Sequence, residues 1–518
     1  MGGYPILTAI IFMPLIGALL VLLTPARRPE LARAVGMMVS MATLGFAVVL
    51  VWEFHTNFGG FQFVEHNRWF DSLGVGYVVG VDGFSLFMVL VTALLFPIGL
   101  LASAGMSERV KAYTFWFLML EGAIFGIFLS LDLIEFFVFW EAMLVPMYFL
   151  IAGWGSANRK YAATKFFLYT AAGSAFLLAA AVALAFLHQA ATGILTFDYR
   201  VLAAWTVSGS GLSTTTESWL FFGFMAAFAI KLPLVPFHTW LPDVHTEAPT
   251  AGSVVLAGVI LKLGAYGILR FAFGLFPHAS VEFAPLFITL GVIGIVYGSV
   301  VAAMQKDAKR VIAYSSVAHM GFIVLGMFSL TVFGLDGASF TMLSHPLTTG
   351  ALFLVIGMLY ERRHTRQIDD FGGIWKSAPK LTALFLIATF AGIGLPAFSG
   401  FIGEFLSLLG AFAVHRWWAV VATTGVILGA VYMLWMFQRV FTGVPEGENA
   451  TMADANGREL LVVVPLLALS LFIGLYPKPV LDRVEPTVKC VMQNFEKHSD
   501  VIRPAADRMD LTRAKGCR

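Results

Sequence analysis

Two lysines occupy stretches of sequence that are apolar enough to lie in a lipid bilayer. Lys231 follows the apolar run FFGFMAAFAI, and Lys262 lies inside SVVLAGVILKLGAYGIL. A charged side chain at the centre of a bilayer costs about 2.5–3.5 kcal/mol on insertion scales. Because ionisable residues that persist at such positions usually mark ion or proton pathways, these lysines are the first candidates for function.

Further ionisable side chains interrupt apolar runs in the same way. They are Glu141 in FFVFWEAMLVPMYFL, His319 in YSSVAHMGFIVLG, His345 in SFTMLSHPLTTGALFL and Glu404 in GFIGEF. Burial brings lysine, histidine and glutamate closer to proton exchange at neutral pH, and a nearby opposite charge reverses the effect. We therefore predict a proton relay through these residues and the two lysines. A purely structural hydrogen bond is the alternative for each histidine.

Four more residues are accessory candidates. Glu121 lies in the apolar run FLMLEGAIFGIF, where it either joins the relay or satisfies a neighbouring helix. The other three, Asp243, His245 and Glu247, lie in LPDVHTEAP. They belong either to the inner end of a broken helix or to a solvated loop.

Two apolar segments contain residues that break helices. Pro233 and Pro236 lie in KLPLVPFHTWLPDVHTEAPTAGS, and Pro396 and Gly400 lie in AGIGLPAFSGFIGEF. Proline lacks the N–H donor and clashes with the preceding turn, and irregular backbone at membrane depth is tolerated only inside protein or beside water. Broken helices in corresponding halves point to a transporter site at the midplane. The separation of Pro233 and Pro396 fits two five-helix repeats, with two unrelated kinks as the alternative.

The composition predicts an all-α polytopic membrane protein. The chain has 518 residues, of which 59% are hydrophobic and 12% charged, with a mean hydropathy of +0.83. A spanning helix needs roughly 20 apolar residues, and the runs are too long for the short alternating strands of a barrel. About fourteen segments qualify: 4–23, 34–54, 83–104, 112–131, 133–153, 164–188, 217–237, 252–275, 283–304, 309–330, 337–360, 381–410, 417–441 and 459–477.

These segments predict one transmembrane domain over residues 1–477. The first repeat would cover about 112–275 and the second about 283–441, and residues 478–518 form a polar, basic tail. Cys490 and Cys517 both lie in this tail, either as a disulfide or as two thiols. Metal-binding cysteine spacings and phosphate-binding glycine loops do not stand out, and nothing indicates nucleic-acid binding.

Lysine and arginine are distributed unequally between the two sets of loops. One set holds eighteen of them and the other set holds four. Because cytoplasmic loops carry the excess of basic residues, we expect the first set inside and both termini outside.

Four motifs carry a resemblance to a known family. WEAMLVPMYFLIAGWG, the long KLPLVPFHTWLPDVHTEAPTAGSVVLAGVILKLGAYGILR, AYSSVAHMGFI and GLPAFSGFIGEF resemble the antiporter-like membrane subunits of respiratory complex I, and within them the chain M (subunit 4) type. The resemblance covers about residues 80–445. It implies fourteen helices with two inverted five-helix repeats, each containing one broken helix.

The resemblance also implies roles for the candidate residues. Glu141 and Lys231 would form the family's Glu–Lys pair, Lys262 would be the central lysine, and Glu404 would be the terminal proton carrier. His319 and His345 would continue the polar axis between the two.

The sequence departs from the family pattern at two places. Pro346 stands where glycine usually follows the histidine, so a kink is expected there. The second break has LPAFSG in place of the more frequent LPGTSG.

The sequence therefore predicts a proton-translocating membrane-arm subunit of a proton-pumping NADH:quinone oxidoreductase. We expect no cofactor in this chain, with FMN, iron–sulfur clusters and quinone in other subunits. The expected partners are the paralogous chains L and N and the lipid bilayer, in an energy-coupling membrane such as the bacterial cytoplasmic membrane. The alternatives are a subunit of a multi-subunit Na⁺/H⁺ antiporter or of a membrane-bound hydrogenase, and a structural spacer without transport.

Overall fold

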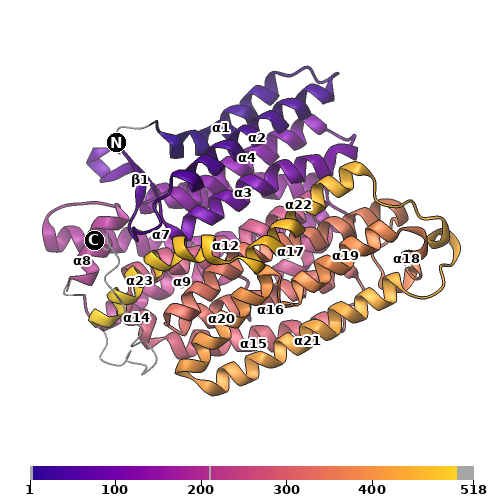
Figure 1. Ribbon diagram of the computed structural model, residues 1–518. Helices are drawn as coiled ribbons and strands as arrows, with labels where there is room; N and C mark the ends of the chain where they lie inside the picture. Colours follow the sequence, from indigo (N-terminus) through magenta and orange to yellow (C-terminus); the bar gives the residue numbers. More distant parts are fainter. Residues whose placement is uncertain (1–3, 209–211, 499–518) are drawn as a thin grey trace.

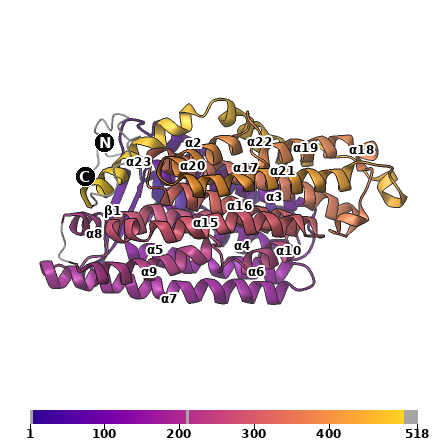
Figure 2. The same ribbon diagram turned by 90° about the horizontal axis from the view of Figure 1, so that it is seen from below.

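Long helices running side by side make up most of the molecule. The computed structural model describes residues 4–208 and 212–498. The helices form an elongated bundle, with α7 along one edge in Figure 2 and α21 along an edge in Figure 1. The helices at the edges expose apolar side chains, as expected for a lipid-facing surface.

Fourteen transmembrane segments are present in the described residues, which confirms the number predicted. Twelve are long enough to cross a membrane without a break: α1 (Ile6–Leu23), α2 (Pro29–Glu53), α3 (Gly83–Ala102), α4 (Val110–Leu129), α5 with α6 (Leu133–Ala142 and Leu144–Trp154), α7 (Arg159–Thr192), α11 to α13 (Thr250–Leu275), α15 (Ala284–Ala303), α16 (Ala308–Phe328), α17 (Val332–Arg363), α21 (Arg416–Phe441) and α22 (Gly457–Leu475). Two are discontinuous: α9 (Thr214–Lys231) with α10 (Trp240–Glu247), and α19 (Pro379–Gly392) with α20 (Ser399–Val414).

The segment Thr250–Leu275 is an interrupted helix at the centre of the bundle. Its six-residue first part, α11 (Thr250–Val255), is followed by a π-helical turn, η3 (Leu256–Ile260). The helix then continues as α12 (Leu261–Gly267), a second π-helical turn, η4 (Ile268–Ala272), and α13 (Phe273–Leu275). Turns of this kind are rare and frequently lie at functional positions. Lys262 is the second residue of α12, between the two.

The two helix breaks share one backbone hydrogen-bond pattern. After α9, the N–H of Leu234 donates to the carbonyl of Ala229 (2.9 Å), and after α19, the N–H of Leu395 donates to the carbonyl of Phe390 (3.1 Å). In both breaks a tight turn follows: the N–H of Phe237 donates to the carbonyl of Leu234, and the N–H of Phe398 donates to the carbonyl of Leu395. The equivalent positions, Leu234 and Leu395, are therefore 161 residues apart, and the two repeats remain a prediction.

Trp240 supplies a hydrogen bond to a backbone carbonyl at the first break. Its indole Nε1 donates to the carbonyl of Ile230 at 2.9 Å, and the side chain is fully buried. A backbone carbonyl released from a helix at membrane depth needs another donor. The aromatic side chain that follows the break supplies that donor.

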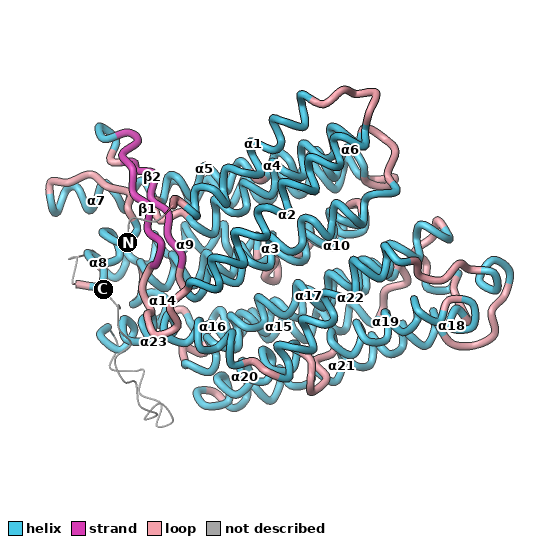
Figure 3. The backbone as a smooth tube through the Cα atoms, turned by 45° about the horizontal axis from the view of Figure 1, so that its top comes forward, coloured by secondary structure: helices cyan, strands magenta, loops and turns pink. Residues whose placement is uncertain are grey.

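The predicted helical fold is confirmed, and a β-hairpin adds a small two-stranded sheet to it. The strands β1 (Gln62–Phe70) and β2 (Val75–Val81) pair antiparallel at the end of the bundle that also carries α8 (Tyr199–Val207) and α14 (Pro277–Glu282) (Figure 3). The sequence between the second and third helices is rich in β-branched and aromatic residues, which favour strands. It is too polar to register as a membrane segment.

Two acidic side chains at the start of α5 attach the hairpin to the bundle. Asp132 Oδ2 accepts the N–H of Gly76 (3.1 Å), and Glu135 Oε2 accepts the N–H of Val78 (2.9 Å). Both carboxylates are buried. The hairpin is thus held by side chain to backbone hydrogen bonds in addition to its packing.

The first half of the basic tail is a helix, α23 (Lys478–His498). It packs on α3 and α17, with Val484, Val488 and Phe495 buried. Cys490 is disulfide-bonded, which favours the disulfide alternative, while Cys517 lies outside the described residues. Apolar residues at helical spacing within a charged sequence explain why this half of the tail is ordered.

Candidate functional site

Glu404 lies just after the second helix break and contacts a histidine. It belongs to the second turn of α20, and its Oε1 lies 2.6 Å from Nδ1 of His319 on α16. The two side chains are 8% and 15% exposed, respectively. A carboxylate and an imidazole at this distance share a strong, charge-assisted hydrogen bond when the imidazole is protonated.

Lys262 and His345 form a second buried pair. Nζ of Lys262 lies 2.7 Å from Nδ1 of His345 on α17, and it also donates to the carbonyl of Ala257 within η3. Nε2 of His345 lies 3.2 Å from the hydroxyl of Thr349. The π-helical turn brings the carbonyl of Ala257 within reach of the lysine, so irregular backbone helps to hold the buried amine.

The two pairs meet through their histidines. The ring centroids of His319 and His345 are 5.4 Å apart, in an edge-to-face arrangement. Lys262, His345, His319 and Glu404 therefore form one continuous set of side chains across four helices, which we call the polar chain. The sequence placed all four in a relay, and the structure brings them together.

Pro346 does not interrupt the polar chain. The helix α17 continues from Val332 to Arg363 with Pro346 inside it. The expected kink does not end the helix, and His345 keeps both of its side-chain contacts. The predicted loss of a backbone donor remains, since proline has no N–H.

Lys231 lies apart from the polar chain, at the last residue of α9. Its Nζ is 4.9 Å from the ring centroid of Trp140 and 5.4 Å from that of Phe166. Glu141 is close enough to interact electrostatically with this ammonium. Among the described residues, however, neither the ammonium nor Oε1 of Glu141 has a hydrogen-bond partner. The predicted Glu–Lys pair is thus a pair through space, without a direct contact.

His245 is buried in α10, where a solvated loop was the alternative. It is 0% exposed and stacks on Phe353 with the ring centroids 4.7 Å apart. Lys262 and Lys309 both lie within electrostatic range of its ring. The solvated-loop alternative is wrong for this residue, which lies between the basic end of the bundle and the polar chain.

Asp243 and Glu247 have different surroundings. Asp243 is partly exposed and makes ion pairs with Lys165 (2.7 Å) and Arg310 (3.4 Å). Glu247 is buried, and its Oε2 accepts the N–H of Asn158 (2.9 Å) before the start of α7. Asp243 therefore sits among charged groups at the basic end, whereas Glu247 has a structural partner.

Glu121 is held by a neighbouring helix. Oγ of Ser40 on α2 donates to its Oε2 at 2.7 Å, and both side chains are fully buried. This contact corresponds to the structural alternative. Glu121 is not in contact with the polar chain.

Several buried charged groups were not among the predicted site residues. Lys309 donates to the carbonyl of Ala248 (2.9 Å), Asp336 lies near the start of α17, and Arg270 makes an ion pair with Asp82 at 2.5 Å. Lys309 and Asp336 are at or just outside the predicted segment boundaries, so extending those segments by one turn would have found them. In the described part of the chain, no group of three or more His, Cys, Asp or Glu could hold a metal ion.

Together, the discontinuous helices and the buried polar chain define a polytopic membrane protein of the antiporter-like class. The profile of the family described as NADH:quinone oxidoreductase/Mrp antiporter, transmembrane, matches residues 130–429. The chain belongs to this family.

Several relatives are similar to this chain over nearly its full length. The chain is 42% identical over 509 residues to NADH-quinone oxidoreductase subunit M of Rhodobacter capsulatus, covering 96% of this chain and 98% of the relative. It superposes on a chain of respiratory complex I from Thermus thermophilus with a TM-score of 0.85 and 31% identity, over 94% of this chain and 99% of that one. A chain of the Mrp complex from Dietzia sp. has the same fold, with a TM-score of 0.79 and 24% identity, over 95% and 99% of the two chains.

Proposed function

We propose that this chain is a proton-translocating membrane subunit of an NADH:quinone oxidoreductase of the complex I type. The polar chain is the observation that carries the proposal. It joins a lysine in the centre of the bundle to a carboxylate beside a broken helix. The names of the full-length relatives support the subunit M assignment.

The geometry suggests an order for the proton steps. A proton enters near α10, where Asp243 and His245 lie, and loads Lys231 or Lys262. From Lys262 it passes to His345, then to His319 and then to Glu404. An imidazole can accept a proton on one nitrogen and release one from the other, so the two histidines can conduct between the terminal groups.

The Glu141–Lys231 interaction controls whether Lys231 retains or releases its proton. Because the electrostatic energy of two charges falls with their separation, a displacement of α5 relative to α9 would change the interaction between the two groups. A stronger interaction retains the proton on Lys231, and a weaker one releases it. We propose that energy from the redox reaction reaches this pair as such a displacement.

The proposal also covers what surrounds the chain. The redox cofactors, namely FMN, iron–sulfur clusters and quinone, belong to other subunits, and this chain performs no redox chemistry. Its neighbours are the paralogous chains L and N, in an energy-coupling membrane. We propose that both termini lie outside, and in support α1 begins and α23 lies at the end of the bundle opposite to α18 (Ile374–Ser377) (Figure 1).

Lys262→Met and Glu404→Gln in the assembled complex test the proposal. We expect proton uptake per NADH oxidised in proteoliposomes to fall by about tenfold or more, since a positioned acid or base contributes 10²–10⁴-fold to proton transfer. Lys376→Met is the control, because this lysine is exposed at the basic end. Normal pumping in both variants would reject the relay. Na⁺/H⁺ exchange without NADH would favour the antiporter alternative.

A further inference from the structure

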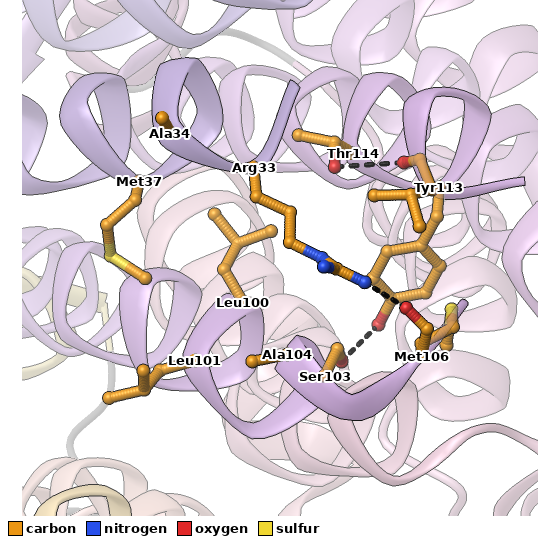
Figure 4. A pocket seen from close by; sticks show the side chains of 11 residues that line it. Arg33, Ala34, Met37, Leu100, Leu101, Ser103, Ala104, Met106, Tyr113 and Thr114 are labelled. Carbon is orange, nitrogen blue, oxygen red and sulfur yellow. Dashed lines mark hydrogen bonds between the residues drawn. The ribbon is translucent and has the colours of Figure 1, made fainter. Parts of the chain in front are cut away.

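A cavity opens beside α2 at the basic end of the bundle, away from the polar chain. Its volume is about 220 Å³, and it lies between α2, the end of α3 and the start of α4. Figure 4 shows Arg33 reaching from α2 across the cavity towards Met106. The cavity is therefore part of the lipid-facing surface, since α2 is mostly exposed along its length.

The cavity has an apolar wall and a polar, cationic end. Met37, Leu100 and Leu101 supply apolar surface, while Ser103 and Tyr113 join hydroxyls at 2.8 Å on the other side. The Arg33 guanidinium donates to the carbonyl of Met106 and, within the described ranges, makes no ion pair. A guanidinium without a carboxylate partner retains donors for an anion, and arginine is suited to bind phosphate oxygens.

The helices α2 and α4 touch closely at the wall of the cavity. A Cβ at Gly36 would come within 2.5 Å of the side chain of Thr114, which lines the cavity. In the loop that follows α3, a side chain at Gly105 would lie 3.7 Å from the guanidinium of Arg458, so this arginine is also close to the end of α3. The connecting loops and the adjacent helix starts add Arg27, Arg28, Arg109 and Lys111, against the acidic Glu30 and Glu108. The surroundings are thus net positive.

We propose that this cavity binds one anionic phospholipid, with its phosphate on Arg33 and part of an acyl chain against Met37, Leu100 and Leu101. Basic pockets between transmembrane helices on the cytoplasmic side bind anionic head groups, and the apolar wall suits a chain rather than water. An anion without a hydrocarbon tail would leave the apolar wall unused. A phospholipid therefore fits the cavity better than free phosphate does.

Photolabelling of the assembled complex tests the site. The complex is reconstituted in phosphatidylcholine nanodiscs that contain a minor fraction of phosphatidylglycerol with a photoreactive acyl chain. We expect labelling of the peptides around Met37 and Leu100. Arg33→Leu should reduce it by about fivefold, because one basic residue near an anionic lipid contributes about 1 kcal/mol. Lys376→Leu is the control, because Lys376 is exposed and neither lines the cavity nor belongs to the loops around it.

A second variant distinguishes the contribution of the cavity's shape from that of the Arg33 charge. Ala104→Leu fills the cavity without removing Arg33, so it too should reduce labelling, and excess inorganic phosphate should not. Equal labelling by photoreactive phosphatidylcholine, or undiminished labelling in both Arg33→Leu and Ala104→Leu, would overturn the proposal. Competition by phosphate would show a simple anion site instead. An unlabelled wild-type cavity would mean that a neighbouring subunit fills it, which would also overturn the proposal.

Discussion

Lys231 is surrounded by aromatic faces rather than by hydrogen-bond acceptors. Trp140 and Phe166 lie within cation–π distance of its Nζ. Such contacts are worth about 2 kcal/mol or more when the cation is desolvated. Trp140 is therefore a positioning residue for the lysine.

Replacing this indole should impair pumping more than assembly. We expect Trp140→Leu to reduce proton uptake per NADH several-fold, because the ammonium loses its aromatic support. Trp140→Phe should retain most of it, since a smaller ring still offers a face. Trp116→Leu is a control, because Trp116 stacks on Phe149 away from Lys231. Equal losses in the Leu and Phe variants of Trp140 would indicate a packing role only.

For single residues, the sequence predicted which side chains belong to the candidate site but not which of them touch one another. Lys262 and Glu404 were found because a charge inside an apolar run is costly. That Lys262 meets His345 directly depends on the register set by η3 and on the packing of α17, neither of which the apolar pattern contains. The absence of a direct Glu141–Lys231 contact is likewise a tertiary property.

Among the elements, the second helix break contains a strained residue. Ala397 has φ of +88°, in the left-handed region that costs a residue with a side chain about 1–2 kcal/mol. The related motif has glycine at this position, and the backbone conformation explains why. The chain therefore tolerates alanine where glycine would be relaxed.

Ala397→Gly should raise the stability of the complex. The relief of strain, less the extra chain entropy of glycine, gives a gain of about 1 kcal/mol. The midpoint of thermal unfolding of this subunit in the purified complex measures it. Ala391→Gly is a control with the opposite sign, because Ala391 is buried in the regular part of α19 and glycine destabilises a helix interior. A destabilised Ala397→Gly variant would contradict the strain argument.

The attachment of the β-hairpin should depend on pH. Burial, opposed by hydrogen bonds from the backbone of Gly76, raises the pKa of Asp132 to about 6. The native carboxyl thus holds a proton that the unfolded chain releases near pH 4, so stability falls as the pH rises from about 4 to 6, by up to about 3 kcal/mol. Hydrogen exchange of β2, corrected for intrinsic rates, should be slower at pH 5 than at pH 7. Asp132→Asn should remove the difference; its persistence would assign the pH dependence to another group.

The helices were predictable and the peripheral elements were not. Long apolar runs set the fourteen segments, and prolines marked both breaks. The hairpin was missed because its strands are too polar to register as membrane segments and lie between much stronger helical signals. The helix α23 was missed because its apolar face is narrow and its average composition is polar.

Across the whole molecule, the buried ionisable residues of the polar chain lie away from the lipid-facing helices, whereas Arg33 lies at the lipid-facing cavity. The segments Thr250–Leu275 and α17, which hold Lys262 and His345, are completely buried in their apolar windows. The helices α2 and α21 are mostly exposed and carry the apolar surface. Buried ionisable groups are thus concentrated at the centre of the bundle, and apolar exposed surface lies at its edge. The shared pattern of the two breaks suggests that Lys231 and Glu404 act at the two ends of one pathway.

A double-mutant cycle tests whether the two ends act in series. If a proton must pass both sites, then Lys231→Met with Glu404→Gln should lose no more pumping than the worse single variant, because residues that act as a unit are strongly non-additive. Two independent pathways would instead give losses that multiply. Arg33→Leu combined with Glu404→Gln is the matched control, since Arg33 lies at the lipid-facing cavity and any effect should be additive. Multiplying losses in the first pair would exclude a single pathway from α9 to α20.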